Sequence, residues 1–501
     1  MRQAPRALPV PFVFAAPLAL AAALALVTAP LAAQPARPAL RGSDALLAAL
    51  DKATPHWVSV EQQIWGFAEV GYQEVKSSAL QQAEMTAAGF ALKVGVAGEP
   101  TAFIAEWGSG KPVIAIIGEF DALPGLSQAV SPDKQPIVAG APGHGCGHHL
   151  LGTGSLAAAV AVKEWMIANK VAGTIRYIAA PAEEGGSGKV YMVRDGIFSD
   201  VDVAVSWHPS DANSVTGQSS QANISGKFRF HGIASHAAGA PERGRSALDA
   251  VEIMDVMTNF LREHVPDGTR MHYIITSGGA APNVVPDFAE VYYLARHNDM
   301  RIVKDVWERI TNAAKGAALG TGTTFDLQLV SSVYNLLIND TLARAMQVHL
   351  ARVGGVPYTT DERLFGEGIQ KSYPNSIVPI AEAAKVQPLK FGGSQMGSTD
   401  VGDVSWTVPT VELEAATWVP GTTAHSWQAV AAGGMTIGAK GMMVAAKTMA
   451  LTAAELFTNP QLIAAAKAEF EQKRGPNFKW STVLGNQKPA LDYRKTATSG
   501  R

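Results

Sequence analysis

Apolar positions recur at two different spacings along this chain. Over residues 43–90 they recur every three or four positions, which predicts helices. Strand-like segments follow, of which 112–118 is a continuous apolar run typical of a strand buried on both faces. The predicted strands are 101–107, 112–118, 173–180 and 201–206. Helices that alternate with buried strands predict an α/β fold with a doubly wound sheet, in which sites form beyond the carboxyl ends of the strands.

The pattern changes from about residue 223. Strands are expected at 224–230, 271–275, 290–296 and 324–333, and helices at 246–263 and 302–319. This order predicts a smaller α+β domain over 221–334, inserted into a catalytic domain that is made of 43–220 and 335–460. A single helix is expected at 429–456, and 461–501 is interpreted as an irregular tail packed on the surface.

The N-terminus has the layout of a secretory signal peptide. Arg2 and Arg6 precede an apolar stretch over residues 10–33 that ends in small residues. We therefore expect residues 1–33 to be removed and the mature protein to be periplasmic or secreted, with no membrane association. Pro11 and Pro17 disfavour a permanent membrane helix, although an uncleaved anchor stays the alternative.

The composition narrows the class of protein. The 501 residues carry a net charge of −2 without a long charge run, which argues against a nucleic-acid partner. With 47% hydrophobic residues, the chain is globular, and its length predicts two domains. The single cysteine, Cys146, can form no disulfide within the chain. A bound metal would protect this free thiol in an oxidising compartment.

The cysteine lies in a glycine-rich turn, Gly143-His144-Gly145-Cys146-Gly147-His148-His149. A thiolate and an imidazole two residues apart are good ligands for Zn²⁺, and the glycines let the backbone bend tightly enough to bring both to one ion. The alternative is a glycine loop around a buried, inert thiol. Three predicted strands end at Asp121, at the Glu183-Glu184 pair and at His208, so these side chains are expected beside Cys146.

The order of motifs resembles the metal-dependent peptidase and aminoacylase family. That family includes carboxypeptidase G-like, auxin-conjugate and aminobenzoyl-glutamate amidohydrolases, and the similarity is greatest to the B-type aminobenzoyl-glutamate utilisation subgroup. The motifs that carry the resemblance are Asp121-Ala122-Leu123-Pro124, Gly145-Cys146-Gly147-His148, Glu183-Glu184-Gly185-Gly186, His208-Pro209, Ser235-His236 and Ala424-His425.

The resemblance implies a centre of two divalent metal ions, with Zn²⁺ expected first and Mn²⁺ or Co²⁺ as alternatives. Its implied ligands are Cys146, His148, Glu184, His208 and His425. Asp121 would orient a ligand from outside the centre, and Glu183 would be the general base. Many relatives have an aspartate where this chain has His149, so the contact of that residue with a metal is left open. Because Cys146 has ligand spacing to His148, a nucleophilic role for its thiol is disfavoured.

The inserted domain would contribute to substrate binding. The resemblance implies that His236 reaches the oxyanion of a second subunit, and that Asn283 and Arg296 grip a substrate carboxylate, for which the planar guanidinium is well suited. Ser398 is a further candidate, through the backbone donors of its loop. A homodimer is expected, and pairing with a related chain is the alternative.

Together these features predict an amidohydrolase that cleaves an amide bond next to a free carboxylate and releases an amino acid. N-acyl or aryl-acyl amino acids, with aminobenzoyl-glutamate first, are the expected small-molecule substrates. A dipeptidase of the same fold is one alternative, and a periplasmic binding protein without catalysis is another. The presence of Glu183 beside the ligands argues against a pure binding protein, which has no use for a base.

Overall fold

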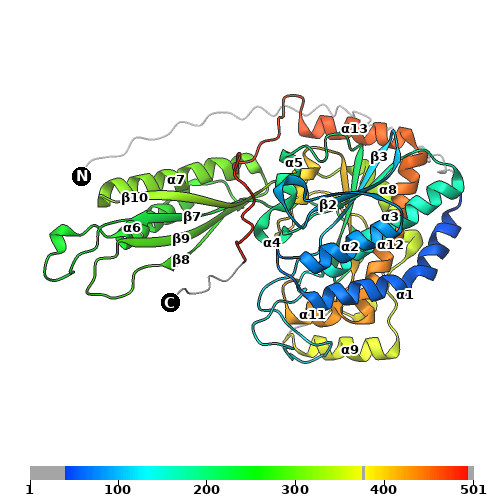
Figure 1. The fold of residues 1–501 in the computed structure, drawn as a ribbon, viewed down its shortest axis with the longest axis horizontal. Coiled ribbons are helices and arrows are strands. Elements are labelled where there is room, and N and C mark those ends of the chain that lie inside the picture. Colours follow the sequence, from blue (N-terminus) through cyan, green and yellow to red (C-terminus); the bar gives the residue numbers. More distant parts are fainter. Residues whose placement is uncertain (1–39, 375–377, 495–501) are drawn as a thin grey trace, which may run out of the picture. The chain divides into compact units, whose positions relative to one another are not determined.

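A seven-stranded mixed sheet forms the centre of the larger domain in the computed structural model, which describes residues 40–374 and 378–494 (Figure 1). The signal predicted for 1–33 lies outside these residues. The strand order is β1-β2-β4-β3-β5-β11-β6. These strands are β1 (Ala91–Val94), β2 (Phe103–Ser109), β3 (Val113–Gly118), β4 (Gly173–Ala179), β5 (Val203–Ser210), β6 (Ser214–Val215) and β11 (Thr410–Ala416).

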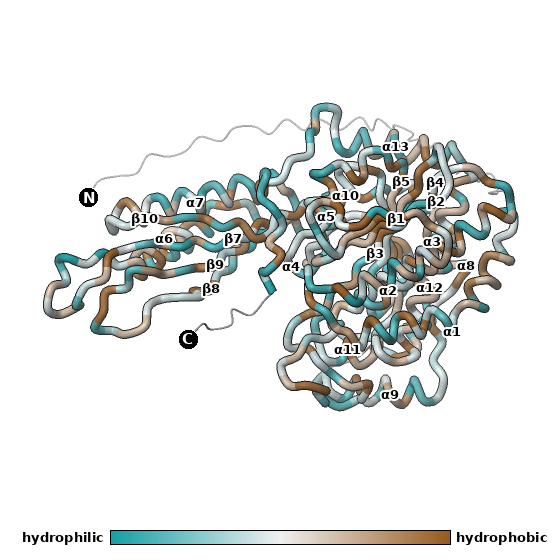
Figure 2. The backbone as a smooth tube through the Cα atoms, viewed as in Figure 1, coloured by the Kyte–Doolittle hydropathy of each residue, from teal (hydrophilic) through white to brown (hydrophobic). Residues whose placement is uncertain are grey.

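The four central strands, β4, β3, β5 and β11, run parallel, and the flanking strands β2, β1 and β6 are antiparallel to their neighbours. Every residue of β3 and β4 is buried, which explains their continuous apolar runs. Figure 2 shows hydrophobic stretches at central strands such as β5. The short edge strand β1 is mostly exposed and has no apolar run, so the hydrophobic pattern did not predict it.

Helices cover both faces of this sheet, so the predicted α/β class is confirmed. One core joins one face to α1 (Ser43–Phe67), α3 (His148–Asn169), α8 (Asp340–Val353) and α12 (Thr436–Thr458). A second core joins the other face to α5 (Gly188–Arg194) and α10 (Val401–Ser405). The remaining helices of this domain include α2 (Val75–Ala87), α4 (Glu183–Gly186), α9 (Thr360–Lys371) and α11 (Trp427–Gly433).

One described helix, α3, is long and apolar enough to cross a membrane, but 72% of its most apolar window is buried inside the protein. It packs on β3 and α12, as expected of a core helix. The single helix expected at 429–456 is wrong, because α11 and α12 are separated by a break and bent by 73°. Gly434 lies at this break, where a Cβ would be 2.6 Å from the indole of Trp65.

The inserted domain is a four-stranded antiparallel sheet in the order β10-β7-β9-β8, with two helices packed on it. Its strands are β7 (Ala222–His231), β8 (Arg270–Ser277), β9 (Phe288–His297) and β10 (Thr324–Val333). Its helices, α6 (Ala247–Leu261) and α7 (Met300–Thr321), begin at N-caps whose side chains accept backbone hydrogen bonds, Ser246 and Asp299. The α+β order predicted for this region is therefore present.

The irregular tail predicted for 461–501 is wrong in its first part. Helix α13 (Pro460–Arg474) occupies it, with Asn459 capping the N-terminus and Pro460 in the first turn. Leu462, Ile463 and Phe470 of this helix are buried. Between Ile463 and Phe470 the chain is mostly alanine, so few large apolar side chains marked the helical period. Residues 475–494 then continue without further helices or strands.

Candidate metal centre

The turn that carries Cys146 is shaped by two glycines. Gly147 precedes α3 with φ 75°, and a Cβ there would lie 2.8 Å from Pro209. Gly145 allows another loop to approach, because its Cβ position is 3.4 Å from Cα of His425. The backbone N–H of His425 donates to the carbonyl of Gly145 at 2.8 Å. The turn and the distant His425 loop are therefore joined through their backbones.

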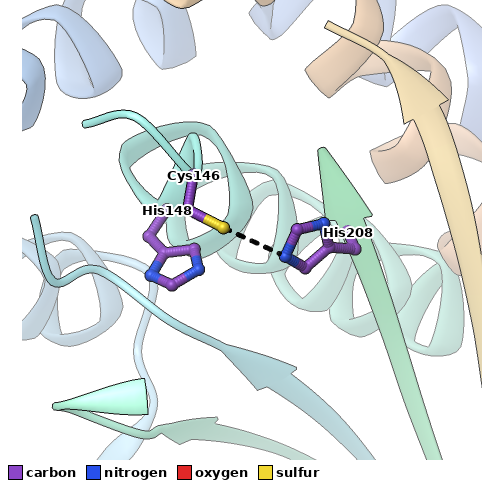
Figure 3. A group of neighbouring side chains, drawn as sticks. All are labelled: Cys146, His148 and His208. Atoms are coloured by element: carbon purple, nitrogen blue, oxygen red, sulfur yellow. Dashed lines mark hydrogen bonds between the residues drawn. The ribbon is translucent and has the colours of Figure 1, made fainter. Parts of the chain in front are cut away.

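A first group of three possible ligands consists of Cys146, His148 and His208 (Figure 3). The three ligand atoms lie within 4.8 Å of one another, and Cys146 Sγ is 3.4 Å from His208 Nε2. Nδ1 of His208 pairs with the carbonyl of Pro209 at 2.7 Å, which fixes the ring and directs Nε2 at the sulfur. One sulfur and two imidazole nitrogens are a donor set that suits Zn²⁺.

A second group consists of Cys146, Glu184 and His425, again with ligand atoms within 4.8 Å. Glu184 Oε1 lies 3.1 Å from His425 Nε2. His425 has φ 58°, a left-handed conformation that is uncommon for a residue with a side chain and is often found at functional sites. Cys146 belongs to both groups, so its sulfur would be a ligand atom in either of them.

Asp121 connects the two groups. Its Oδ1 lies 2.9 Å from Nδ1 of His148, and its Oδ2 accepts a hydrogen bond from the backbone N–H of Glu184 at 3.0 Å. Burial alone would raise the pKa of Asp121, but His148 and the Glu184 N–H outweigh burial and hold this pKa below its ordinary value. An ionised carboxylate at Nδ1 leaves Nε2 of His148 as the ligand atom.

Glu183 is partly exposed beside these ligands. It forms a third group with Glu119 and His148, whose ligand atoms also lie within 4.8 Å of one another. Burial, followed by the charges of Glu119, Glu184 and Asp400, raises the pKa of Glu183 well above its ordinary value. A carboxyl group with a raised pKa can hold a proton near neutral pH, as a general base must after it has deprotonated water.

A buried lysine beneath the centre had no role in the sequence-based interpretation. Nζ of Lys189 lies 2.6 Å from both Glu119 Oε1 and Asp400 Oδ1, and all three side chains are almost fully inaccessible. Glu119 Oε2 is in turn 3.2 Å from Nε2 of His148. A buried ammonium between two carboxylates has its charge compensated. Lys189 follows the Glu183-Glu184 motif in the sequence, but no local pattern indicates that it pairs with Asp400.

Three buried ligand atoms support metal occupancy of this centre. Glu119 Oε2, His148 Nε2 and Glu184 Oε1 are inaccessible and make no hydrogen bond of good geometry among the described residues, although His148 Nε2 lies 3.2 Å from Glu119 Oε2 and Glu184 Oε1 lies 3.1 Å from His425 Nε2. Buried polar atoms are normally satisfied, and leaving them unpaired is costly. Divalent ions held by the two groups around Cys146 would satisfy His148 and Glu184, so the residues present fit the cofactor.

A cleft of about 500 Å³ opens over the centre and contains most of the predicted site. Arg296, from the end of β9, and Ser398 line it together with the ligands. Nε of Arg296 and Oγ of Ser398 are buried without a hydrogen-bond partner among the described residues. Burial lowers the pKa of Arg296, because part of its charged side chain has left water. Asn223, Glu412 and Glu414, which the sequence motifs did not identify, also line the cleft.

His236 and Asn283 lie elsewhere, on the surface of the inserted domain, and are not among the residues that line the cleft of their own chain. They are neighbours, because the N–H of Ala237 donates to the carbonyl of Asn283 at 3.0 Å. Nδ1 of His236 accepts from the N–H groups of Ala238 and Gly239, at 3.2 and 3.0 Å. Nε2 of the neutral ring must then carry the proton, which makes it a donor.

The two other histidines of the turn are directed away from the sulfur. Nε2 of His149 pairs with the carbonyl of Gly433 at 3.2 Å, and Nε2 of His144 pairs with the carbonyl of Ile64 at 3.1 Å. Their rings lie 4.8 Å apart, and burial lowers the pKa of both. They are neutral packing groups that tie the turn to α1 and α11.

Comparisons with known proteins identify the family of this chain. Residues 219–321 match the peptidase dimerisation domain. The chain is 41% identical over 450 residues to the B-type subunit of p-aminobenzoyl-glutamate hydrolase from Escherichia coli, covering 85% of this chain and 94% of that protein. It is 28% identical over 440 residues to Xaa-Arg dipeptidase of Mus musculus, covering 85% and 91%.

Solved structures show the same fold at lower identity. An aminobenzoyl-glutamate utilization protein from Klebsiella pneumoniae superimposes with a TM-score of 0.59 at 20% identity, covering 82% of this chain and 98% of that chain. A dinuclear metal-binding peptidase from Bacillus subtilis gives a TM-score of 0.53 at 17% identity, covering 83% and 99%. Fold and site define a metal-dependent hydrolase of amide bonds. The chain belongs to the M20 peptidase family.

Proposed function

We propose that this protein hydrolyses N-acyl or aryl-acyl amino acids that carry a free carboxylate, with p-aminobenzoyl-glutamate as the first candidate. The observation that carries the proposal is the pair of ligand groups that share Cys146, with Glu183 beside them and Arg296 in the same cleft. The relative in Escherichia coli is named for hydrolysis of p-aminobenzoyl-glutamate, and it matches almost along its whole length.

Each residue of the cleft has a task in this reaction. Arg296, whose guanidinium lacks a partner at Nε among the described residues, binds the free carboxylate of the substrate. Two divalent ions, zinc first, would be held by Cys146, His148, Glu184, His208 and His425, and they would polarise the amide carbonyl and acidify the attacking water. Glu183 takes the proton of that water and delivers it to the leaving amine.

The developing negative charge on the carbonyl oxygen requires a further donor, and His236 is not among the residues that line the cleft of its own chain. His236 has such a donor at Nε2, on the exposed surface of the inserted domain. We therefore assign His236, with Asn283 beside it, to the site of a second subunit.

The inserted domain carries a surface suited to this pairing. Strand β8 is an edge of its sheet, with Ile274 61% and Ile275 45% exposed. On α6, Val256, Met257 and Phe260 are also exposed, and Phe260 is 72% accessible. An unpaired edge strand with apolar neighbours is a ready surface for association of two chains. We propose a homodimer through this surface. Because the A-type subunit of p-aminobenzoyl-glutamate hydrolase is also a relative, pairing with a related chain is the competing assembly.

A dipeptidase that releases a basic amino acid is the second candidate. Glu412 and Glu414 of β11 both line the cleft. Burial, followed by the charges of Glu119 and Glu414, raises the pKa of Glu412 to about 8, so a cationic group placed there would be favoured. The relative named Xaa-Arg dipeptidase is consistent with a basic side chain in such a position.

One experiment separates these functions. Purified protein is analysed for metals per chain and then incubated with p-aminobenzoyl-glutamate, other N-acyl amino acids and dipeptides that end in arginine, with ninhydrin detection of released amino acids. Release of glutamate supports the first candidate, and release of arginine alone supports the second. Two bound metals without any hydrolysis would indicate a non-catalytic binding protein.

Export is tested separately, by sequencing the N-terminus of protein recovered from the periplasm, where loss of residues 1–33 is expected.

A further inference from the structure

Residues 475–494, here called the C-terminal strap, are held along their length by aromatic and buried contacts (dark red in Figure 1). The ring of Phe478 lies 4.7 Å from that of Trp406. Nε1 of Trp480 donates to Asp403 at 2.9 Å, and Leu484 is only 3% exposed. The strap is therefore packed against the rest of the fold, and these contacts fix the position of its C-terminal end.

The end of the strap reaches the metal centre. Oη of Tyr493 and a guanidinium nitrogen of Arg494 both donate to the carbonyl oxygen of Glu184, at 3.0 and 2.6 Å. The N–H of the same residue donates to Asp121 at 3.0 Å. Both backbone polar groups of Glu184 are thus fixed, one by the residue that orients His148 and the other by the strap.

The loop around Glu184 needs external support. Ala182 and Ser187 have φ of 55° and 58°, although each carries a Cβ, and Glu184 itself departs from helical geometry at φ −68°, ψ 62°. Non-glycine residues in left-handed conformations are strained and persist only where the surroundings enforce them. One backbone hydrogen bond lies within the loop, from the N–H of Gly186 to the carbonyl of Ala182 at 2.9 Å, and contacts from other parts of the chain add to it.

A pair of tyrosines supplies part of this support. Tyr72 donates to the carbonyl of Gly186 at 2.9 Å, and its ring meets that of Tyr493 edge-on with centroids 5.8 Å apart. The fit is close, because a Cβ on Gly71 would lie 2.3 Å from Oη of Tyr493. Tyr72 and the strap together bind two carbonyls of the Glu183–Gly186 segment.

We propose that Tyr493 and Arg494 are positioning residues for the reaction: they hold the loop that presents Glu183 as base and Glu184 as metal ligand. They act through the backbone of Glu184. The roles of Glu183 and Glu184 are those of the proposed function, on which this proposal rests. The new element is that the C-terminal strap holds the Glu183–Gly186 segment in place.

The test uses the full chain and three variants, Tyr493→Phe, Arg494→Ala and the double change. Two quantities are measured besides Tm: kcat and KM separately, and the rate at which a chelator removes the bound metals. The double variant should lower kcat on the order of 10- to 100-fold with little change in KM, and it should lose metal faster. Arg494→Lys, which retains a donor, should recover part of both. A chain that ends at residue 490 keeps Trp480 and Leu484 and should resemble the double variant.

Gln487→Ala is the matched control, because Gln487 lies on the same strap but donates to the carbonyl of Leu329, at 3.0 Å. It should lower Tm at most and leave kcat and metal loss unchanged. Wild-type kcat and metal-loss rate in the double variant would overturn the inference, as would changes equal to those of Gln487→Ala. A wild type that binds metals but hydrolyses no substrate would count against the proposed function instead, and the metal-loss comparison would still test the strap.

Discussion

Sγ of Cys146 lies 3.4 Å from Nε2 of His208, which joins the turn before α3 to the last part of β5 across 62 positions of the chain. The same sulfur also belongs to the group formed with Glu184 and His425. A single side chain therefore connects both halves of the centre, and its replacement should affect both.

Cys146→Ser should lower metal content and activity together, since a hydroxyl is a much weaker ligand than a thiolate. We expect fewer than two metals per chain by elemental analysis and a loss of kcat of at least about 100-fold. His149→Gln is the control within the same turn, because His149 pairs with the carbonyl of Gly433. Full activity of Cys146→Ser with two metals bound would remove the thiol from the centre.

Glu183→Ala should separate chemistry from binding. Metal content and KM should stay close to wild type, while kcat falls by a factor on the order of 10² or more, as expected for the loss of a general base. Elemental analysis and steady-state kinetics on the same preparation measure both. If the variant loses metal and Glu184→Ala does not, the tasks of base and ligand are reversed between the two residues.

Arg296→Ala should mainly weaken the binding of substrates that carry a free α-carboxylate. The guanidinium lies in the cleft with Nε unpaired among the described residues, so its removal should raise KM for such substrates by roughly 10- to 100-fold. Converting the carboxylate to an amide should penalise the wild type heavily and the variant little. An equal penalty in both proteins would place the carboxylate elsewhere, with the Ser398 loop as the next candidate.

His236→Ala and Glu183→Ala should complement each other if His236 serves the neighbouring subunit. Each variant alone should be nearly inactive, since an oxyanion donor contributes roughly 3–4 kcal/mol to the transition state. Mixed under conditions that exchange subunits, the two should form hybrid dimers with one complete site, and activity should return. Mixing differently tagged wild-type chains controls for exchange. If exchange is proven and the mixture stays inactive, the assignment of His236 to a second subunit is wrong.

Glu61→Gln should change the pH dependence of stability. Glu61 Oε1 accepts a hydrogen bond from Gln62 at 2.9 Å, Oε2 lies 3.7 Å from Nε2 of His149, and burial raises the pKa of Glu61 to about 8. The folded state then holds the proton more tightly than the unfolded state. The stability contributed by the protonated carboxyl is present below the ordinary pKa of about 4.5 and is lost as pH rises to about 8.

Glutamine stays neutral, so it does not lose this contribution. The free energy of unfolding of Glu61→Gln relative to wild type should therefore rise between about pH 5 and pH 8, by roughly 1.4 kcal/mol per pH unit at the steepest. Urea unfolding of both proteins at several pH values measures this difference. The contributions of the other titrating groups cancel in it, because the two proteins share those groups. A flat difference across the range would show that Glu61 is not a neutral buried acid.

The sequence by itself indicated four strands of the central sheet, β2 to β5, and the side chains expected at their ends, whereas the full set of ligands was implied by the family resemblance. Strands buried on both faces must be apolar throughout, so β3 and β4 were evident as runs, and parallel strands end at one edge, so Asp121, Glu184 and His208 were expected together. The glycines around Cys146 marked a tight turn. These features depend on local spacing and on one rule of sheet geometry, which a sequence displays directly.

Only the tertiary structure decided which distant groups meet. Lys189 pairs with Asp400, and Glu184 receives hydrogen bonds from Tyr493 and Arg494, across 211, 309 and 310 positions of the chain. No local period relates such positions, because their contact depends on how helices and loops pack after the sheet has formed. Likewise, only the tertiary structure shows that His236 is not among the residues that line the cleft of its own chain. Local patterns fix the elements and their edges, whereas long-range packing decides which polar groups compensate one another.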